Sequence, residues 1–233
     1  MKNTKKTIKL VLNNTLDNVK ILIRHYRRLA LMIILMLVIT LQGMSPNLVI
    51  SPLQLRTEYY KNTKEKINEK IIDEVNKYII ENAKNSKLDS KTLVNVCHEY
   101  KLDIVFVLAQ GLLESHFGTK GVASKTNSVF NVGTYDNGKI LYTYKNPNES
   151  IEPYAILLTK NYLINTSLSN LLKDKGYVNK YGNRFASATS YEDRLRSLMV
   201  KIKLETSIGS LQRIYDMDSN EFDSLFQVTQ FLN

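Results

Sequence analysis

One segment constrains the fold more than any other, from Ile104 to about Phe117, because its first ten residues, IVFVLAQGLL, are almost entirely apolar. As a helix it would be apolar on most of its circumference, which is typical of a helix buried on all sides. Leaving it in water would expose several side chains whose burial is worth about 1.5–3 kcal/mol each. We therefore predict a central helix that follows an N-cap at Asp103 and ends at Gly118.

Hydrophobic periodicity predicts further helices on both sides of this segment. From about Thr63 to Lys84, apolar residues recur at three- and four-residue spacing, and the opposite face is Lys, Glu and Asn. A second helix is predicted after Asp89, which can cap a helix N-terminus. Later helices are predicted from Glu149 to about Thr166 and from Tyr191 to about Glu205. The body of the protein is therefore expected to be helical.

A polar region between Gly118 and Pro147 interrupts this helical pattern. Its composition is dominated by Asn, Gly, Thr and Tyr, and the tripeptide Asp136-Asn137-Gly138 is a strong turn signal. The residues that follow, ILYTY at 140–144, alternate loosely between the two faces expected of a strand. We predict a small β-hairpin or irregular lobe here, which makes the fold class α+β.

The net charge of +10 is concentrated at the N-terminus. Residues 1–28 contain eight Lys and Arg residues against one Asp, so +7 of the charge lies there and only +3 lies in the rest of the chain. A basic block that directly precedes an apolar run is typical of a segment held on the cytoplasmic side of a membrane. We therefore expect no nucleic-acid partner from this charge.

The apolar run that follows, LALMIILMLVITL, spans residues 29–41 and has no charge. Its 13 residues are few against the roughly 20 that cross a bilayer core. A signal anchor, a cleaved signal peptide and a buried core helix are all open, and the anchor explains the most features. An anchor or a signal peptide would place the domain in the periplasm, or outside the cytoplasmic membrane, or secreted.

These patterns divide the chain into five segments. The divisions are a basic N-terminal segment at 1–28, a transmembrane or signal-anchor helix at 29–44, a linker at 45–60, a domain at 61–206 and a C-terminal tail at 207–233. The tail contains apolar residues but no motif. We expect a monomer.

Cysteine and histidine usage excludes several classes of site. The single Cys97 rules out an internal disulfide, and its apolar helical surroundings favour a buried thiol. His25, His98 and His116 lack the spacing of zinc ligands, and no H-E-x-x-H motif occurs. No phosphate-binding glycine loop is present, so neither a metal nor a cofactor is expected.

Glu114 lies near the end of the central apolar helix, where the chain turns into the polar region. A carboxyl group in such a place loses hydration, which disfavours its charged form and raises its pKa. A raised pKa is what a general acid needs to protonate a glycosidic oxygen near neutral pH. From this residue alone, a glutamate that simply faces water is the competing interpretation.

The residues around Glu114 resemble a known family. The segments AQGLLESHFG (109–118) and NSVFNV (127–132) are similar to the patterns A-Q-x-x-L-E-S-x-W-G and N-N-L-F-G-I of glycoside hydrolase family 73. These are endo-β-N-acetylglucosaminidase-type peptidoglycan hydrolases of autolysins, flagellar proteins and phage lysins. Two further segments, SIEPY (150–154) and FASATSY (185–191), keep the family's order, so the resemblance runs from about residue 93 to 203.

The resemblance implies a lysozyme-like α+β domain, with a cleft between the helices and the β-lobe and with Glu114 on its floor as general acid. It implies peptidoglycan glycan strands as the partner and hydrolysis of the β-1,4 bond after N-acetylglucosamine. Asp136 and Tyr191 are further catalytic candidates. The candidate substrate contacts lie in or beside the two motifs: Phe117, Asn127, Phe130, Tyr135 and His116.

The chain departs from the family pattern at several positions. Phe117 replaces a tryptophan, and Asn131 replaces a glycine, although Asn is after Gly among the residues best able to adopt a positive φ. Phe185 replaces a tyrosine whose hydroxyl is assigned to the family's active site. Three nearby residues could supply that hydroxyl: Tyr177, Tyr181 and Tyr191.

Many members of the family carry a second acidic residue in the β-lobe. In this chain Thr134 occupies that position, and Asp136 lies two residues further on, in a turn. Water activated by a carboxylate and attack by the substrate's own 2-acetamido oxygen both remain open. Two alternative functions remain open as well. The domain could bind glycan without cutting it, or it could be a lytic transglycosylase or muramidase on a related fold, since these enzymes share the E-S-x-x-G core.

Overall fold

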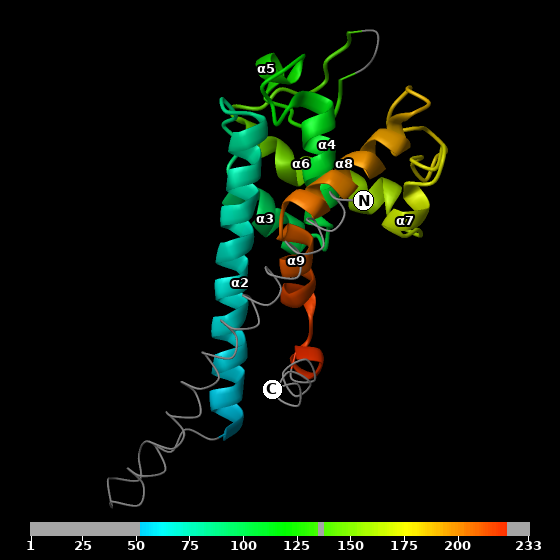
Figure 1. Cartoon of the computed structure of the whole chain (residues 1–233). Helices are drawn as coiled ribbons and strands as arrows, with labels where there is room; N and C mark the ends of the chain where they lie inside the picture. The colour runs from blue at the N-terminus through cyan, green and yellow to red at the C-terminus, as the bar shows by residue number, and fades with distance from the viewer. Residues whose placement is uncertain (1–51, 135–137, 223–233) are drawn as a thin grey trace, which may run out of the picture. The chain divides into compact units, whose positions relative to one another are not determined.

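The computed structural model describes residues 52–134 and 138–222 (Figure 1). The predicted basic segment at 1–28, the apolar helix at 29–44 and the first part of the linker lie outside the described residues, as do Tyr135 and Asp136. The described elements are α2 (Pro52–Asn82), α3 (Ser90–Glu99), α4 (Ile104–Ser115), α5 (Ala123–Thr126), the 3-10 helix η2 (Pro147–Ser150), α6 (Ile151–Leu157), the π-helical turn η3 (Leu158–Tyr162), α7 (Leu168–Leu171), α8 (Tyr191–Glu205) and α9 (Ile208–Asp216).

The central helix predicted from the apolar run is confirmed as α4. Its N-cap is Asp103, whose carboxylate accepts a hydrogen bond from the backbone N–H of Phe106. Nearly every residue of α4 is buried, and the helix packs against α3, α8 and α9. The helix ends at Ser115, three residues before Gly118, so the residue at its C-cap is His116.

Two other helices also follow their local signals. Asp89 caps α3 as predicted, with its carboxylate accepting from the backbone N–H of Thr92, and α8 spans the predicted range from Tyr191 to Glu205. In contrast, α2 begins at Pro52, well before the predicted start at Thr63 and inside the segment assigned as a linker. Proline is well tolerated at the first position of a helix, where its missing N–H has no partner to lose.

The tail gave no motif, yet part of it forms α9, which packs on α4 and α8 through the buried side chains of Ile208 and Leu211. The side chain of Gln212 also caps the start of α4. Its Oε1 accepts from the backbone N–H of Ile104 at 2.8 Å, and its Nε2 donates to the carbonyl of Leu102 at 2.9 Å. Residues 208–216 therefore stabilise the central helix and pack as part of the helical body.

The mainly helical fold is confirmed, but the lobe contains almost no strand, so the β part of the α+β class is corrected to an irregular lobe, the second of the two predicted forms. Within the described part of 118–147, pairing is limited to one isolated antiparallel bridge, between Thr134 and Ile140. The backbone N–H of Leu141 donates to the carbonyl of Gly133, but that of Tyr144 turns away to Thr126 in α5. The ladder therefore ends after one step, and the lobe is built of turns. A mainly helical body remains consistent with the lysozyme-like class.

No helix in the described ranges is both long and apolar enough to cross a bilayer. The predicted membrane segment at 29–44 is outside those ranges.

Candidate active site

The end of α4 is an unusual turn in which three consecutive residues have a positive φ: His116 at 47°, Phe117 at 54° and Gly118 at 82°. Ser115 holds this turn in place. Its Oγ accepts from the backbone N–H of Gly118 at 2.7 Å and donates to the carbonyl of Val129 at 2.6 Å. Ser115 therefore joins the helix end to the loop that follows α5. Ser115 is part of the motif around Glu114, but this role was not predicted from the sequence.

Glu114 occupies the last turn of α4 and is partly buried. Its Oε1 accepts a hydrogen bond from the hydroxyl of Tyr191, at the start of α8, and its Oε2 accepts from Nδ2 of Asn131 at 3.0 Å. Burial raises the pKa of the Glu114 carboxyl above its ordinary value, while the two hydrogen bonds and the charge of Arg194 oppose the rise. The sequence-based expectation of a carboxyl with a raised pKa is thus confirmed in direction and cause.

A buried polar network stands behind Glu114. Gln110, one turn earlier on α4, is fully buried and donates from Nε2 to the hydroxyl oxygen of Tyr191 at 3.1 Å. Its Oε1 accepts from the hydroxyls of Tyr154 on α6 and Tyr177 in the loop before α8. Satisfied buried networks of this kind hold side chains in single orientations. The Gln of the motif, to which the sequence analysis gave no role, is therefore the hub that orients Tyr191 towards Glu114.

The three tyrosines that could replace the hydroxyl lost at Phe185 differ in what they contact. Tyr191 contacts Glu114 directly, Tyr177 contacts Gln110, and Tyr181 is 73% exposed and makes neither contact. Burial, followed by the charge of Glu114, raises the pKa of Tyr191, so its hydroxyl keeps its proton as a donor. The ring of Phe185 stacks on Tyr177, with centroids 4.8 Å apart, and fills space in the same aromatic cluster.

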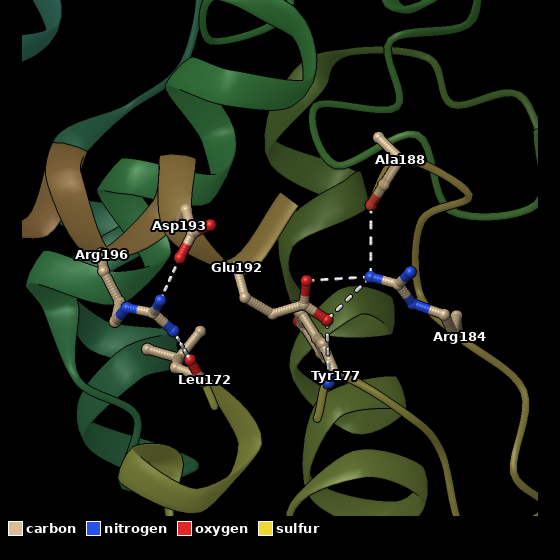
Figure 2. Close-up of polar contacts among 7 residues, drawn as sticks. All are labelled: Leu172, Tyr177, Arg184, Ala188, Glu192, Asp193 and Arg196. Atoms are coloured by element: carbon tan, nitrogen blue, oxygen red, sulfur yellow. Dashed lines mark hydrogen bonds and ion pairs between the residues drawn. The ribbon is translucent and has the colours of Figure 1, made fainter. Parts of the chain in front are cut away.

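A second carboxyl group, Glu192, lies directly beside Tyr191 in the chain but serves a different purpose (Figure 2). It is only 1% exposed, and both of its oxygens contact Nη2 of Arg184, at 2.9 and 2.8 Å. Its Oε1 also accepts from the backbone N–H of Tyr177 at 3.1 Å, and Arg184 donates to the carbonyl of Ala188. This ion pair fastens the loop before α8 to the helix, and so helps to position Tyr177 and Tyr191.

One known protein family matches this part of the chain. Residues 90–204, from the start of α3 almost to the end of α8, match the model of the Glucosaminidase family, described as mannosyl-glycoprotein endo-beta-N-acetylglucosaminidase. This domain belongs to the glucosaminidase family. The matched range contains Glu114, Asn131 and Tyr191, and at the level of the family it supports a glycosidase that hydrolyses peptidoglycan. A search of curated proteins found no match to the chain.

Two candidate substrate contacts of the glucosaminidase domain lie in its core. Phe117 has no exposed surface and packs edge-on against Tyr78 of α2, with ring centroids 6.2 Å apart. Phe130 is 1% exposed and stacks on Tyr154 at a centroid distance of 3.6 Å. The structure gives both rings a packing role beneath the site, and brings neither to a surface that a glycan could touch.

The remaining candidates are spread over the lobe of the glucosaminidase domain. Asn127 has a φ of 57°, and its Nδ2 donates to the carbonyls of Tyr144 and Lys145, so its amide holds the lobe together. His116 is partly exposed beside Glu114, and slight burial followed by the nearby Lys120 lowers its pKa. Tyr135 and Asp136 lie outside the described residues.

Two further glutamates of the domain are engaged away from Glu114. The Glu149 carboxylate accepts from the backbone N–H of Lys145 and from Nδ2 of Asn146, and Glu152 accepts from the hydroxyl of Tyr100. The contacts of Glu149 are local, whereas Glu152 joins α6 to Tyr100 at the end of α3. These contacts give both residues a structural role, and neither has a hydrogen-bond partner in common with the Glu114 carboxyl.

A cavity of about 610 Å³ lies at the opposite, N-terminal end of α4. Its lining includes Leu102, Asp103, Lys203 and Arg213, and none of the residues that hydrogen-bond to Glu114. Asp103 and Asp216 also line this cavity, but Asp103 is engaged as the N-cap of α4, and Asp216 lies beyond the residues that match the glucosaminidase family. The end of α4 therefore stays the candidate active site.

Proposed function

We propose that the domain hydrolyses the β-1,4 bond that follows N-acetylglucosamine in peptidoglycan, with Glu114 as the general acid. One observation supports this most strongly: a partly buried carboxyl is held by two neutral donors, Tyr191 and Asn131, and has a raised pKa. Such a group keeps its proton to a higher pH than an exposed glutamate does, and it is still held in one orientation. The family match supports the reaction class, and the position of Glu114 supports its role.

In this mechanism the protonated Glu114 gives its proton to the glycosidic oxygen while the bond from that oxygen to the anomeric carbon breaks. The leaving sugar departs as an alcohol, and Glu114 becomes a carboxylate. Hydrogen bonds from the Tyr191 hydroxyl and the Asn131 amide then stabilise the new negative charge. The anomeric carbon, electron-poor as the bond breaks, is attacked from its other face.

Two routes are available for that attack. Asp136 could remove a proton from an attacking water, which would invert the anomeric configuration. Alternatively, the 2-acetamido oxygen of the substrate could attack first and water could open the resulting ring, which would retain the configuration. Because Glu149 and Glu152 are engaged elsewhere, Asp136 is the carboxylate to test, and the configuration of the first product distinguishes the two routes.

The decisive variant is Glu114→Gln, which keeps the shape of the side chain but cannot donate an acidic proton. Release of reducing ends from purified cell wall should fall by about 100-fold or more, since general acid catalysis contributes at least that factor. The matched control is Glu149→Gln, because Glu149 lies in η2 and its carboxylate accepts hydrogen bonds from Lys145 and Asn146. Thermal unfolding of both variants should show that the fold is kept.

The products decide between the proposed reaction and its alternatives. Mass spectrometry should find reducing N-acetylglucosamine ends in the wild-type digest. Anhydromuramyl or reducing muramyl ends would instead identify a transglycosylase or a muramidase. Binding of the wild-type protein to cell wall without turnover would identify a non-catalytic module, and full activity of Glu114→Gln would reject the assigned acid.

We also propose that segment 29–44 acts as a signal anchor and places the domain outside the cytoplasmic membrane, where its glycan substrate lies. The basic block at 1–28 supports this orientation. The test is a fusion of residues 1–60 to a reporter enzyme that is active only after export. The fusion should be active and membrane-bound, and deletion of 29–44 should abolish both properties. An inactive reporter in the fusion that keeps all of residues 1–60 would contradict the proposal.

A further inference from the structure

The loop residue Asn131 makes a contact with Glu114 that its backbone geometry favours. Its φ is 52°, in the left-handed region, as the sequence predicted for a residue that replaces glycine. The backbone is fixed on both sides, since its N–H donates to the carbonyl of Ser128 and its own carbonyl accepts from the N–H of Thr134, both at 3.0 Å. The direction in which the side chain leaves the loop is therefore set by this turn.

The amide of Asn131 holds two parts of the same residue. Its Nδ2 lies 3.0 Å from the backbone carbonyl of Glu114 and 3.0 Å from the carboxyl Oε2. The last carbonyls of a helix have no partner within the helix, so the first contact satisfies one of them. The second contact joins the carboxyl group to that same fixed point, which restricts rotation of the Glu114 side chain.

The orientation of this amide is determined by the atoms it faces. A backbone carbonyl can only accept a hydrogen bond, so the nitrogen and not the oxygen of the Asn131 amide must point to Glu114. The contact with Oε2 is consequently always a donation. It is stronger when Glu114 is a carboxylate than when it is neutral, because hydrogen bonds to ionised acceptors are stronger.

We propose that Asn131 is a positioning residue for Glu114, which fixes the orientation of its carboxyl group and favours its ionised form. The inference rests on the proposed role of Glu114 as the general acid. Tyr191 fixes Oε1 from the helical body, and Asn131 fixes Oε2 from the lobe, so the acid is held from both sides of the site. A glycine at this position, as in the family pattern, has no side chain with which to make this contact.

The test compares two asparagines that share a backbone conformation. Asn131→Gly suits the φ of 52° and removes both hydrogen bonds to Glu114. Asn131→Asp keeps the size of the side chain but replaces the donor by a second carboxylate. The control is Asn127→Gly, which also suits its φ of 57° and removes amide hydrogen bonds, but only those to the carbonyls of Tyr144 and Lys145.

The expected readout is the pH dependence of activity. A general acid works in its protonated form, so activity falls as the pH rises through the pKa of Glu114. Removing the donor raises that pKa, and the alkaline limb of the profile should move to higher pH in Asn131→Gly and further in Asn131→Asp. We expect kcat to fall roughly tenfold in Asn131→Gly through loss of orientation, with KM changed much less. In Asn127→Gly the alkaline limb should stay where it is in the wild type.

A second measurement separates failure of this inference from failure of the proposed function. The titration of the Glu114 carboxyl carbon can be followed by NMR without substrate, with Glu114→Gln to assign the signal. If this titration and the alkaline limb are both unchanged in Asn131→Gly, the positioning role is wrong even though Glu114→Gln is inactive. If the titration moves but Glu114→Gln is fully active, the contact is real and the proposed function is wrong.

Discussion

Two carboxyl groups neighbour Tyr191, and they are stabilised in different ways: Glu114 accepts from its hydroxyl, and Glu192 follows it in the chain. Both carboxylate oxygens of Glu192 accept hydrogen bonds from the guanidinium of Arg184 (Figure 2). Glu114 accepts hydrogen bonds only from neutral groups, the hydroxyl of Tyr191 and the amide of Asn131. The direct partner of Glu192 is therefore a cation, whereas the direct partners of Glu114 are neutral donors.

This difference matches two different tasks. The Arg184–Glu192 pair fastens a loop to α8, which is a structural task. A general acid must instead lose and regain a proton in each catalytic cycle. Burial without a directly bound cation gives Glu114 a raised pKa, and its neutral partners still hold its position. The aromatic cluster of Tyr177 and Tyr191 connects the two regions, with ring centroids 5.8 Å apart.

The largest effect is expected from breaking the structural pair. Arg184→Met would leave the Glu192 carboxylate almost fully buried without its cation, and loss of one partner of such a pair costs about 3 kcal/mol of unfolding free energy. The control is Arg196→Met on α8, since Arg196 pairs with the exposed Asp193 and such pairs contribute about 1 kcal/mol or less. Arg196 also donates to the carbonyl of Leu172, so the control removes a side-chain hydrogen bond to a loop as well. Chemical denaturation measures both, and equal losses would show that the Glu192 pair is not structural.

A smaller effect is expected from removing one hydroxyl between the two regions. Tyr191→Phe keeps the ring but deletes the donor to Glu114 and the acceptor for Gln110, which leaves a buried amide unpaired. We expect a loss of about 1–2 kcal/mol in stability. The pKa of Glu114 should rise further, so the alkaline limb of activity should move to higher pH. Steady-state kinetics across pH checks this, and a limb that moves to lower pH would contradict it.

The smallest effect concerns how stability depends on pH. The pKa of Glu114 is higher in the folded protein than in the unfolded chain, so the folded state binds more protons between those two values. Stability contributed by the neutral carboxyl is therefore present at low pH and is lost as the pH rises through the folded pKa. Relative to the wild type, Glu114→Gln should become progressively more stable over that rise. A difference in unfolding free energy that is constant with pH would contradict the raised pKa.

Local signals predicted much of the helical body. Asp89 and Asp103 cap α3 and α4 as expected, because a capping side chain acts on backbone N–H groups only two or three residues away. The apolar run predicted that α4 is central, since no other position could bury all of its faces. The positive φ of Asn131 was also predictable, because few residues tolerate that conformation.

Features that depend on distant contacts were not predictable. Gln212 caps α4 from more than a hundred residues away, and neither residue reveals its partner in the sequence. Gln110 and Ser115 were visible within the motif, but their roles depend on Tyr154, Tyr177 and Val129, which only the fold brings near. The alternation at 140–144 allowed either a hairpin or an irregular lobe, and the outcome depends on the backbone N–H of Tyr144, which bonds to α5 instead of extending the ladder.

The pKa of the Glu114 carboxyl is the most direct test of its role as the general acid. The measurement is the carboxyl-carbon titration of Glu114 in the folded protein, followed by NMR beside the pH profile of reducing-end release from cell wall. The account predicts that Glu114 titrates above its ordinary value of 4.5 and that the alkaline limb of activity falls at the same pH. A Glu114 that titrates at or below 4.5, or an alkaline limb that is unchanged when Glu114 is replaced by Gln, would contradict it.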